Sequence, residues 1–220
     1  MVKIRGVISD LDGTLIDSND EHTQAWTRAM REHGCDVTFD QIRRFVGMGS
    51  DNLLPSAIGI EADSPRGKEI AQRHDAIFRT EYLPTLKPFP QVRALFERMR
   101  VDGLIIAVAT SGEKEDMEKL LKLAQIDDLV GFKVSSADVE KSKPHPDLIH
   151  VALERLGCAP EATIMLGDSP YDVQAASKAR VGVIGLRCGG FSDDDLRGAV
   201  ALYNDPADLL AQYNVSSLVR

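Results

Sequence analysis

Short apolar runs that end at polar residues constrain the fold of this chain more than any other feature of its sequence. Four such runs span residues 4–8, 104–109, 162–166 and 181–186, and a weaker one spans 132–134. Apolar runs of this length are typical of strands buried on both faces of a parallel sheet. Helical patterns separate them at 92–100, 113–124, 146–156 and 171–179. Because strands and helices alternate, we expect an α/β fold with a doubly wound parallel sheet.

One interval breaks this alternation. The stretch 12–110 is far longer than the roughly 30 residues of one strand–helix–strand unit, and its surplus contains no strand-like run. It does show helical periodicity, because His22, Trp26 and Ala29 share one helix face and a second helix is predicted over 66–82. We therefore expect a helical domain, residues 16–86, inserted into a core made of residues 1–15 and 87–220.

The composition excludes several classes of partner. With 34 acidic and 26 basic side chains the formal net charge is −8, which argues against a broad basic surface for nucleic acid or anionic membranes. The three cysteines lack the spacing of a disulfide framework or a metal site, which favours a reducing compartment. The sequence shows no signal-peptide core and no long apolar segment. We expect a cytoplasmic protein, a monomer or weak homodimer, with no nucleic-acid or membrane partner.

Aspartates follow two of the predicted strands. Asp10 and Asp12 come just past the first strand, Asp168 ends another, and Asp172 lies one helical turn later. In open parallel sheets, ligands bind beyond the carboxyl ends of the strands, so we expect these side chains to converge there. Four converging carboxylates repel one another unless a cation lies among them. An oxygen-only ligand set with few protein ligands favours Mg²⁺ over calcium.

A second group of residues suits a phosphate. Thr110, Ser111 and Gly112 lie where a strand gives way to a helix, and hydroxyls and free N–H groups at a helix N-terminus bind phosphate oxygens. Gly112 permits close approach of the backbone. Lys143 would add a fixed positive charge, with Lys141 as the competing candidate. With a cation and a carboxylate, these groups suit phosphoryl transfer, in which positioning and charge neutralisation do most of the catalysis.

Four segments, taken in order, resemble the four motifs of the haloacid dehalogenase superfamily. They are Asp-Leu-Asp-Gly-Thr at 10–14, Thr-Ser at 110–111, Lys-Pro at 143–144 and Gly-Asp-Ser-Pro-Tyr-Asp at 167–172. The resemblance covers essentially the whole chain, and the insertion is similar to the family's α-helical cap of the first type. The most similar subgroup is that of the phosphoglycolate phosphatase and β-phosphoglucomutase relatives. The resemblance implies a Rossmann-like core and a magnesium-dependent phosphatase for a small phosphorylated metabolite, of the phosphoglycolate or sugar-phosphate type.

The resemblance also implies roles for the motif residues. Asp10 would attack phosphorus to give an aspartyl-phosphate, and Asp12 would protonate the leaving oxygen and then deprotonate the attacking water. Mg²⁺ would be held by the Asp10 carboxylate, the Asp12 backbone carbonyl and Asp168. Asp172 would hold water molecules or Lys143. The phosphoryl group would be bound by Thr110, Ser111, Gly112 and Lys143.

Substrate-facing residues are also expected in the insertion. His22 resembles the histidine with which sugar-phosphate-processing relatives face the substrate, although a lone histidine in a first helical turn is more often a surface residue. Residues 47–50 resemble the cap loop that closes over substrate, which brings in Met48, Gly49 and Ser50. Two glycines so close together are also ordinary helix punctuation. We expect Trp26 to be part of the core of the cap.

Departures from the family pattern bear on the reaction. Mutase-like relatives grip a second phosphate with an arginine where this chain has Ser50, which favours a phosphatase over the alternative of a sugar-phosphate mutase. Dehalogenases lack the aspartate that matches Asp12, and phosphonate hydrolases need a cap lysine that residues 46–58 do not contain. A phosphorylated-aspartate receiver domain gathers similar residues but needs only about 120 of them. Arg180 stands where relatives have glycine, so we expect that helix to end differently, near Gly182.

Overall fold

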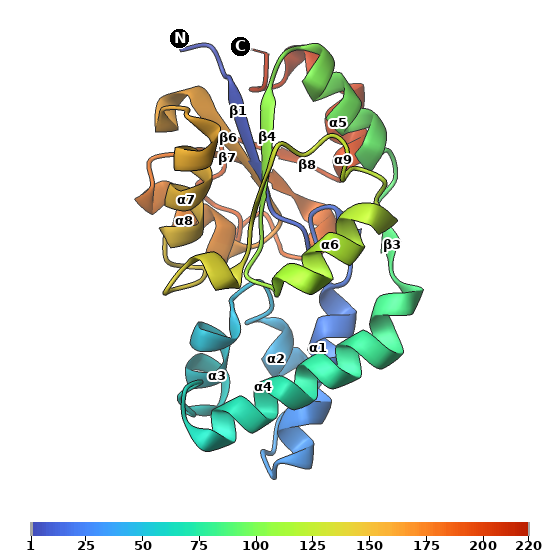
Figure 1. Ribbon diagram of the computed structural model, residues 1–220, viewed down its shortest axis with the longest axis vertical. Coiled ribbons are helices and arrows are strands. Elements are labelled where there is room, and N and C mark those ends of the chain that lie inside the picture. The colour runs from blue at the N-terminus through green and yellow to red at the C-terminus, as the bar shows by residue number, and fades with distance from the viewer. Residues whose placement is uncertain (1, 220) are drawn as a thin grey trace.

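The computed structural model describes residues 2–219, and its centre is a six-stranded parallel sheet with helices on both faces (Figure 1). The strands lie in the order β5-β4-β1-β6-β7-β8, and each neighbouring pair is parallel. The chain order reverses on either side of β1, so the sheet is doubly wound as expected. Five of the strands match the predicted apolar runs, and β8 was not predicted. Their bounds are β1 Gly6–Ser9, β4 Ile105–Ala109, β5 Phe132–Val134, β6 Thr163–Gly167, β7 Gly182–Leu186 and β8 Ala201–Tyr203.

Side chains alternate between the two faces of the sheet and so build two hydrophobic clusters. Val7 of β1 packs in the cluster that includes α5 (Val92–Val101), α6 (Lys114–Leu123) and α9 (Pro206–Ala211). Ile8, the next residue, packs in the cluster of α7 (Asp147–Leu156) and α8 (Pro170–Lys178) on the other face (Figure 1). Both side chains are fully buried. Each such burial stabilises the fold by about 1.5–3 kcal/mol.

Four helices come from the stretch that follows β1, and Figure 1 shows them beneath the sheet, at the end opposite the two chain termini. The predicted helix over 66–82 is present, because α4 continues directly into a π-helical turn at Phe78–Tyr82. The first helix follows Ser18 and stops before Gly34, which adopts a φ of +76° that favours glycine. The four helices are α1 (Asn19–Glu32), α2 (Phe39–Arg43), α3 (Ser50–Ile58) and α4 (Pro65–Ile77).

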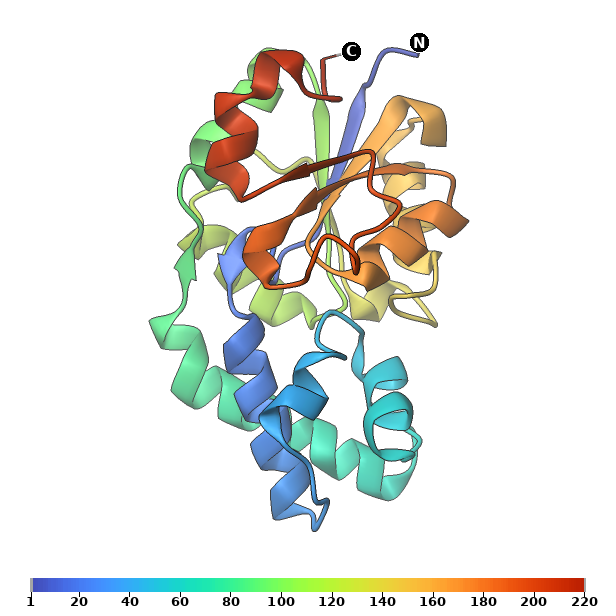
Figure 2. The same cartoon turned by 180° about the vertical axis from the view of Figure 1, so that it is seen from behind.

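A two-stranded antiparallel ribbon joins the two chain crossings between the sheet and these helices. It consists of β2 (Ile16–Asp17) and β3 (Lys87–Pro88), with Ile16 opposite Pro88 and Asp17 opposite Lys87 (Figure 2). The entering and leaving segments are therefore fastened to each other. A movement of the inserted helices relative to the sheet would therefore involve both segments together.

Further contacts hold the inserted helices against the core. The Arg43 guanidinium lies 5.1 Å from the ring centre of Phe191 and donates a hydrogen bond to the Gly189 carbonyl. The Tyr171 hydroxyl donates to the Arg44 carbonyl. The side chain of Arg43, which precedes the predicted cap loop in the sequence, therefore contacts the core.

The end of α8 differs from the expectation that the helix runs on toward Gly182. The helix stops at Lys178, and Arg180 adopts the left-handed conformation with φ +60°. The Arg180 amide donates to the Ser177 carbonyl and the Val181 amide donates to the Ala176 carbonyl, which is the hydrogen-bond pattern of a Schellman motif. These two bonds hold a residue other than glycine in a conformation that costs roughly 1–2 kcal/mol.

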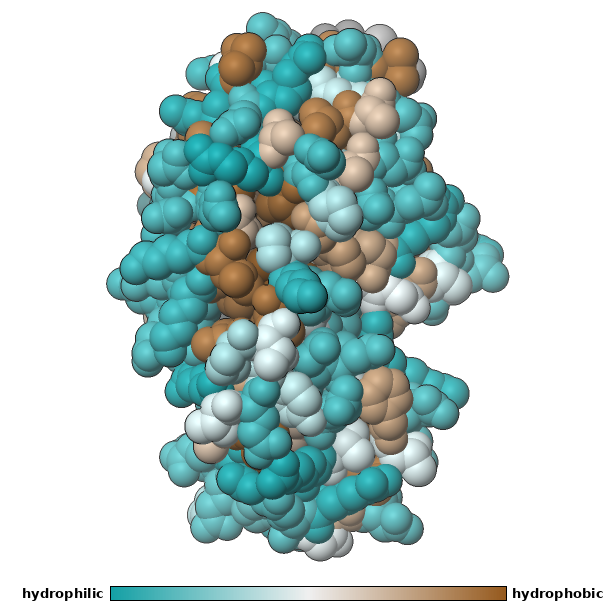
Figure 3. Space-filling view, turned by 90° about the vertical axis from the view of Figure 1, so that its right-hand side faces the viewer, coloured by the Kyte–Doolittle hydropathy of each residue, from teal (hydrophilic) through white to brown (hydrophobic). Residues whose placement is uncertain are grey.

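The surface of the face covered by α5 and α6 is mostly hydrophilic, with apolar side chains gathered near mid-height (Figure 3). The three cysteines, Cys35, Cys158 and Cys188, are free. No helix within residues 2–219 combines the length and the apolar character that crossing a bilayer requires.

Candidate active site

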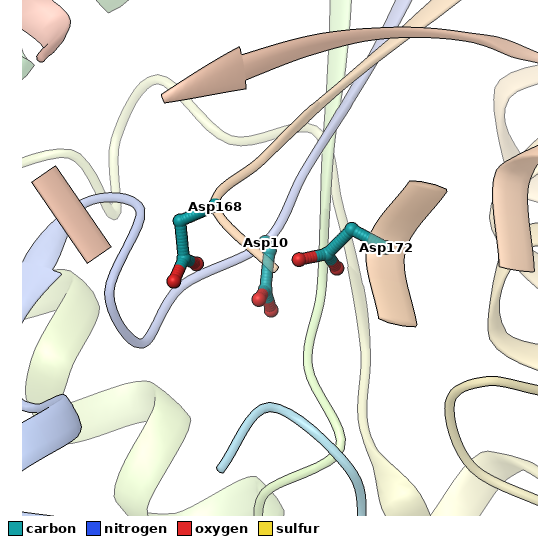
Figure 4. A group of neighbouring side chains, drawn as sticks. All are labelled: Asp10, Asp168 and Asp172. Atoms are coloured by element: carbon teal, nitrogen blue, oxygen red, sulfur yellow. The ribbon is translucent and has the colours of Figure 1, made fainter. Parts of the chain in front are cut away.

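Three buried carboxylates converge at the carboxyl edge of the sheet. Asp10 follows β1, Asp168 follows β6, and Asp172 lies in the first turn of α8. One oxygen from each lies within 4.8 Å of the others, and Figure 4 shows Asp10 between the other two. The predicted convergence is thus present for these three. The fourth predicted acid, Asp12, is outside this cluster and has its own partners.

Lys143 is the cation of this cluster. Its Nζ lies 2.6 Å from Oδ1 of Asp10 and 2.9 Å from Oδ1 of Asp172, and its side chain is 1% exposed. Burial alone would lower the pKa of Lys143, but the two carboxylates outweigh burial and hold this pKa above its usual range. Lys143 is therefore a fixed positive charge. The competing candidate, Lys141, is exposed to solvent.

Asp168 is held by neutral hydrogen-bond donors. Thr14 Oγ1 donates to its Oδ1 over 2.7 Å, and Asn19 Nδ2 donates to its Oδ2 over 2.9 Å. Burial, followed by the charge of Asp172, nevertheless raises the pKa of Asp168 to about 7. A Cβ at Gly189 would lie 1.8 Å from Oδ2 of Asp168, so only glycine fits against this carboxylate.

The local negative charge exceeds what Lys143 alone compensates. Burial raises the pKa of Asp10 well above its usual range even though Lys143 opposes the shift. The raised pKa values of Asp10 and Asp168 mean that these carboxylates carry their charge at a cost in this environment. A hard divalent cation would remove that cost, and the donor set of carboxylate oxygens is the one such cations prefer.

Asp172 is fixed by the N-terminus of α8. The Ser169 amide and hydroxyl donate to its Oδ2 over 3.0 and 2.6 Å, which completes a capping box. Its other oxygen, Oδ1, stays free to accept from Lys143. The sequence-based expectation that Asp172 holds Lys143 is therefore met by the geometry.

Asp12 faces the inserted helices instead of the acid cluster. Its Oδ1 accepts from the Ser18 hydroxyl over 2.7 Å and lies 3.2 Å from Nε2 of His22. Burial raises the pKa of Asp12, but the charge and hydrogen bonds of His22 and Ser18 outweigh it, so the pKa lies below its usual value. Asp12, to which the family resemblance gives the role of general acid/base, thus contacts His22, the histidine predicted to face the substrate.

A chain of ring nitrogens continues from His22 into α4. Nδ1 of His22 lies 3.3 Å from Nε2 of His74, and Nδ1 of His74 lies 2.9 Å from Oδ1 of Asp75. The Asp75 carboxylate only accepts, so His74 donates from Nδ1, and the Nε2 of a neutral His74 must accept from His22. His22 then carries a proton on Nδ1. Its 3.2 Å contact with Asp12 is a hydrogen bond only when a further proton lies between those two groups.

Aromatic stacking holds these rings in place. The His22 ring stacks on Phe78 with centroids 3.8 Å apart, and the His74 ring stacks on Trp26 at 3.9 Å. Trp26 is 6% exposed, so it belongs to the core of the inserted helices as predicted. Burial lowers the pKa of His74 to about 4, which keeps its ring neutral near pH 7.

The buried His74 should make stability fall in acid. Its pKa of about 4 lies below the ~6.5 of a free histidine, so the unfolded chain binds a proton that the folded chain excludes between these pH values. The free energy of unfolding should therefore decrease as pH drops from 6.5 to 4, by about 3 kcal/mol from this group. Urea unfolding at several pH values measures this free energy, which should fall less steeply with decreasing pH in His74→Gln than in wild type. His150→Gln, at an exposed histidine, should show the same pH dependence as wild type. The same pH dependence in all three proteins would contradict the role given to His74.

One cavity of about 290 Å³ brings most of the predicted residues together. Thr110, at the end of β4, is 2% exposed, and its Oγ1 accepts from the Gly112 amide over 3.0 Å. The Ser111 hydroxyl is buried without a hydrogen-bond partner. A Cβ at Gly49 would lie 1.9 Å from the Ser142 hydroxyl, so this loop approaches the core closely. The predicted residues that line the cavity are Asp10, Asp12, His22, Met48, Gly49, Ser50, Thr110, Ser111, Gly112 and Lys143.

Several residues that hold the site in place were not predicted as site residues. Thr14 and Asn19 support Asp168, and Ser18 supports Asp12. Thr14 belongs to the first motif, and Ser18 and Asn19 stand at the start of α1, so their proximity to the acids could have been inferred. His74 could not, because it lies in the last turn of α4 and nothing in its sequence neighbourhood pairs it with His22.

Comparison with known proteins agrees with this geometry. The family model described as "Haloacid dehalogenase-like hydrolase" matches residues 7–186. The chain is 30% identical to the phosphoglycolate phosphatase of Yersinia pestis over 191 residues, which is 84% of this chain and 82% of that protein. It is 25% identical to the pyrophosphatase PpaX of Oceanobacillus iheyensis, with 82% of each chain covered.

Solved structures show the same fold. A hydrolase from Pseudomonas syringae superposes with a TM-score of 0.89 at 27% identity, covering 96% of this chain and 98% of that one. The family model spans all four motifs, from the strand that precedes Asp10 to the strand that follows α8. The resemblance drawn from the motifs is thereby confirmed, and the chain is a member of the haloacid dehalogenase-like hydrolase family.

Proposed function

We propose that this hydrolase is a magnesium-dependent phosphatase that cleaves a small phosphorylated metabolite through an aspartyl-phosphate on Asp10. The observation that carries the proposal is the position of Asp10. Its carboxylate lies in the cavity at the end of β1, 2.6 Å from a buried lysine and beside two further acids. In this proposal residues 16–86 form a cap that covers the site, and residues 1–15 and 87–220 form the catalytic core.

The metal would be held by the carboxylates of Asp10 and Asp168 and by the backbone carbonyl of Asp12. The oxygen donors and the excess of buried negative charge around Lys143 both fit a hard cation. When bound, Mg²⁺ supplies neutralisation of charge on the phosphoryl oxygens. Asp172 orients Lys143, which supplies a second positive charge beside Asp10.

The protein's own groups then divide the reaction into two displacements. A carboxylate oxygen of Asp10 forms a bond to phosphorus, and the bond from phosphorus to the leaving oxygen breaks. Asp12 donates the proton that the leaving oxygen takes up. Asp12 next takes a proton from water as that water attacks phosphorus, which releases inorganic phosphate and restores Asp10. Thr110, Ser111 and Gly112 would position the phosphoryl oxygens during both steps.

The contact between Asp12 and His22 supports this use of Asp12. The hydrogen-bond chain from Asp75 through His74 places a proton on Nδ1 of His22, so the other ring nitrogen, Nε2, faces Asp12 over 3.2 Å. In this proposal a proton that Asp12 and His22 share would be available to the leaving oxygen without recruitment from bulk water. The name of the Yersinia pestis relative supports phosphate monoesters as the substrate class.

Metal removal tests the proposed function. Hydrolysis of 4-nitrophenyl phosphate should be abolished by excess EDTA and restored by added Mg²⁺, because Lys143 alone does not compensate the buried acids. Circular dichroism should show that the EDTA-treated protein remains folded. An unchanged rate in EDTA would reject the magnesium requirement, and the absence of hydrolysis with Mg²⁺ for every phosphate ester tried would reject the phosphatase.

A further inference from the structure

We propose that the cavity selects phosphate monoesters whose leaving group carries no negative charge and presents an apolar surface. The inference rests on the proposed phosphatase function and adds the substrate class. It follows from three features of the cavity: the supply of positive charge, the surplus of acids and the apolar wall.

Positive charge is scarce in the cavity. Among residues 2–219, Lys143 is the only lysine or arginine that lines it, and its Nζ is already engaged by Asp10 and Asp172. Both ring nitrogens of His22 have partners, and burial lowers the pKa of His74 to about 4, so its ring is neutral near pH 7. Once Lys143 neutralises the phosphoryl group, no cationic side chain of the described lining is left for a second anion.

Negative charge is present in the cavity lining outside the acid cluster as well. Asp75 contacts the neutral His74, which compensates none of its charge, and the cation that acts on Asp75, Arg79, is already ion-paired with Asp116. Glu113 and Glu140 add two exposed carboxylates to the lining. An anionic leaving group would be placed near these like charges, and such juxtapositions are strongly unfavourable.

The two remaining acids of the lining already have partners. Asp116 is paired with Arg79 over 2.8 Å, so the arginine beside the cavity is occupied. The N-terminus of α3, which follows the loop 47–50, would otherwise attract an anion. Asp51 occupies its first turn, however, and accepts from the Ser142 amide over 3.0 Å. Neither feature offers a free place for a second negative charge.

Apolar side chains form another part of the cavity lining. They come from the inserted segment and from α6 of the core, so an apolar leaving group would gain contact with both. A cavity of about 290 Å³ is at the small end of ligand sites, which limits the leaving group to a small molecule. The apolar lining consists of Trp26, Met48, Leu53, Phe78, Met117 and Leu120.

These features predict a substrate that differs from the one named for the Yersinia pestis relative. Phosphoglycolate carries a carboxylate on its leaving group, and a sugar bisphosphate carries a second phosphate. Among the described lining residues, neither anion has a lysine or arginine partner besides Lys143. The same scarcity argues against the mutase alternative, because a mutase must hold a substrate with two phosphates.

Matched substrate pairs test the inference with the magnesium-loaded enzyme. We would compare phosphoglycolate with its amide, phosphoglycolamide, and 4-carboxyphenyl phosphate with phenyl phosphate. In both pairs the uncharged leaving group should give the higher kcat/KM, by about tenfold or more. If the anionic member is hydrolysed as well or better, the substrate inference is overturned and the phosphatase stands. If the folded enzyme hydrolyses none of the four, the phosphatase and the inference fail together.

A charge variant tests whether the cavity acids cause the discrimination. Asp75→Asn keeps an oxygen that accepts from His74 but removes the negative charge. The ratio of kcat/KM for the uncharged substrate to kcat/KM for the anionic one should therefore decrease about threefold or more in each pair. Asp63→Asn is the matched control, because Asp63 is an exposed acid of the same insertion and does not line the cavity. Its ratios should equal those of wild type. Wild-type ratios in Asp75→Asn would overturn the role given to this acid.

Discussion

Replacing Asp10 with asparagine should reduce phosphate ester hydrolysis by at least about 10³-fold while the protein stays folded. The amide has almost the shape of the carboxylate but is not a nucleophile, and removal of a nucleophile commonly costs several orders of magnitude in rate. Folding should survive, because the raised pKa of Asp10 shows that its buried charge is costly and Asp172 still pairs with Lys143. Initial rates with 4-nitrophenyl phosphate, together with thermal unfolding, measure both outcomes.

The matched control for this substitution is Asp127→Asn. Asp127 is an exposed acid that does not line the cavity, so the same change of charge there should leave the rate and the melting temperature unchanged. A rate near that of wild type in Asp10→Asn would refute covalent catalysis by this residue. Loss of the folded state would instead show that Asp10 has a structural role that its pKa does not suggest.

Replacing Lys143 with methionine should damage both stability and activity. Methionine fills a similar volume, but Asp10 and Asp172 then lose the cation that lies 2.6 and 2.9 Å from them. Removing one partner of a buried ion pair leaves uncompensated charge and typically costs about 3–5 kcal/mol. Urea unfolding in EDTA at neutral pH should show this loss in the free energy of unfolding, and hydrolysis should fall together with it.

Lys141 provides an internal control two residues away. Its side chain is exposed, so Lys141→Met should change the free energy of unfolding by less than about 0.5 kcal/mol and should leave hydrolysis intact. Equal effects at the two positions would mean that the segment, and not the buried charge of Lys143, is responsible. Hydrolysis at the wild-type rate in Lys143→Met would exclude this lysine from the reaction.

Much of the fold could be predicted because the decisive signals are local. The apolar runs predict five strands, since strands buried on both faces must be apolar throughout. The sixth strand, Ala201–Tyr203, is a three-residue strand at the edge of the sheet, too short to leave a run. The end of α8 was predicted wrongly, because two backbone hydrogen bonds hold Arg180 where its own preference would not.

The candidate site likewise contains residues that local sequence signals place and contacts that only tertiary packing determines. Residues that follow a strand directly, such as Asp10 and Asp168, are placed by the strand, so their convergence could be predicted from the sequence. Contacts that depend on how the inserted helices sit on the sheet could not. The pairing of His22 with His74 requires α1 and α4 to pack face to face, and the charge of the cavity depends on acids from several separate segments.

The position of β1 in the sheet bears on how the chain folds as it is synthesised. This strand is the first to be made, but it lies between β4 and β6, and Gly6 pairs with both Ile105 and Thr163. Until those strands leave the ribosome, β1 has no partner and its apolar residues have no core to join. The inserted helices, which rely on nearby contacts, can form much earlier. The nascent chain therefore carries an unpaired central strand until its two neighbours have been synthesised.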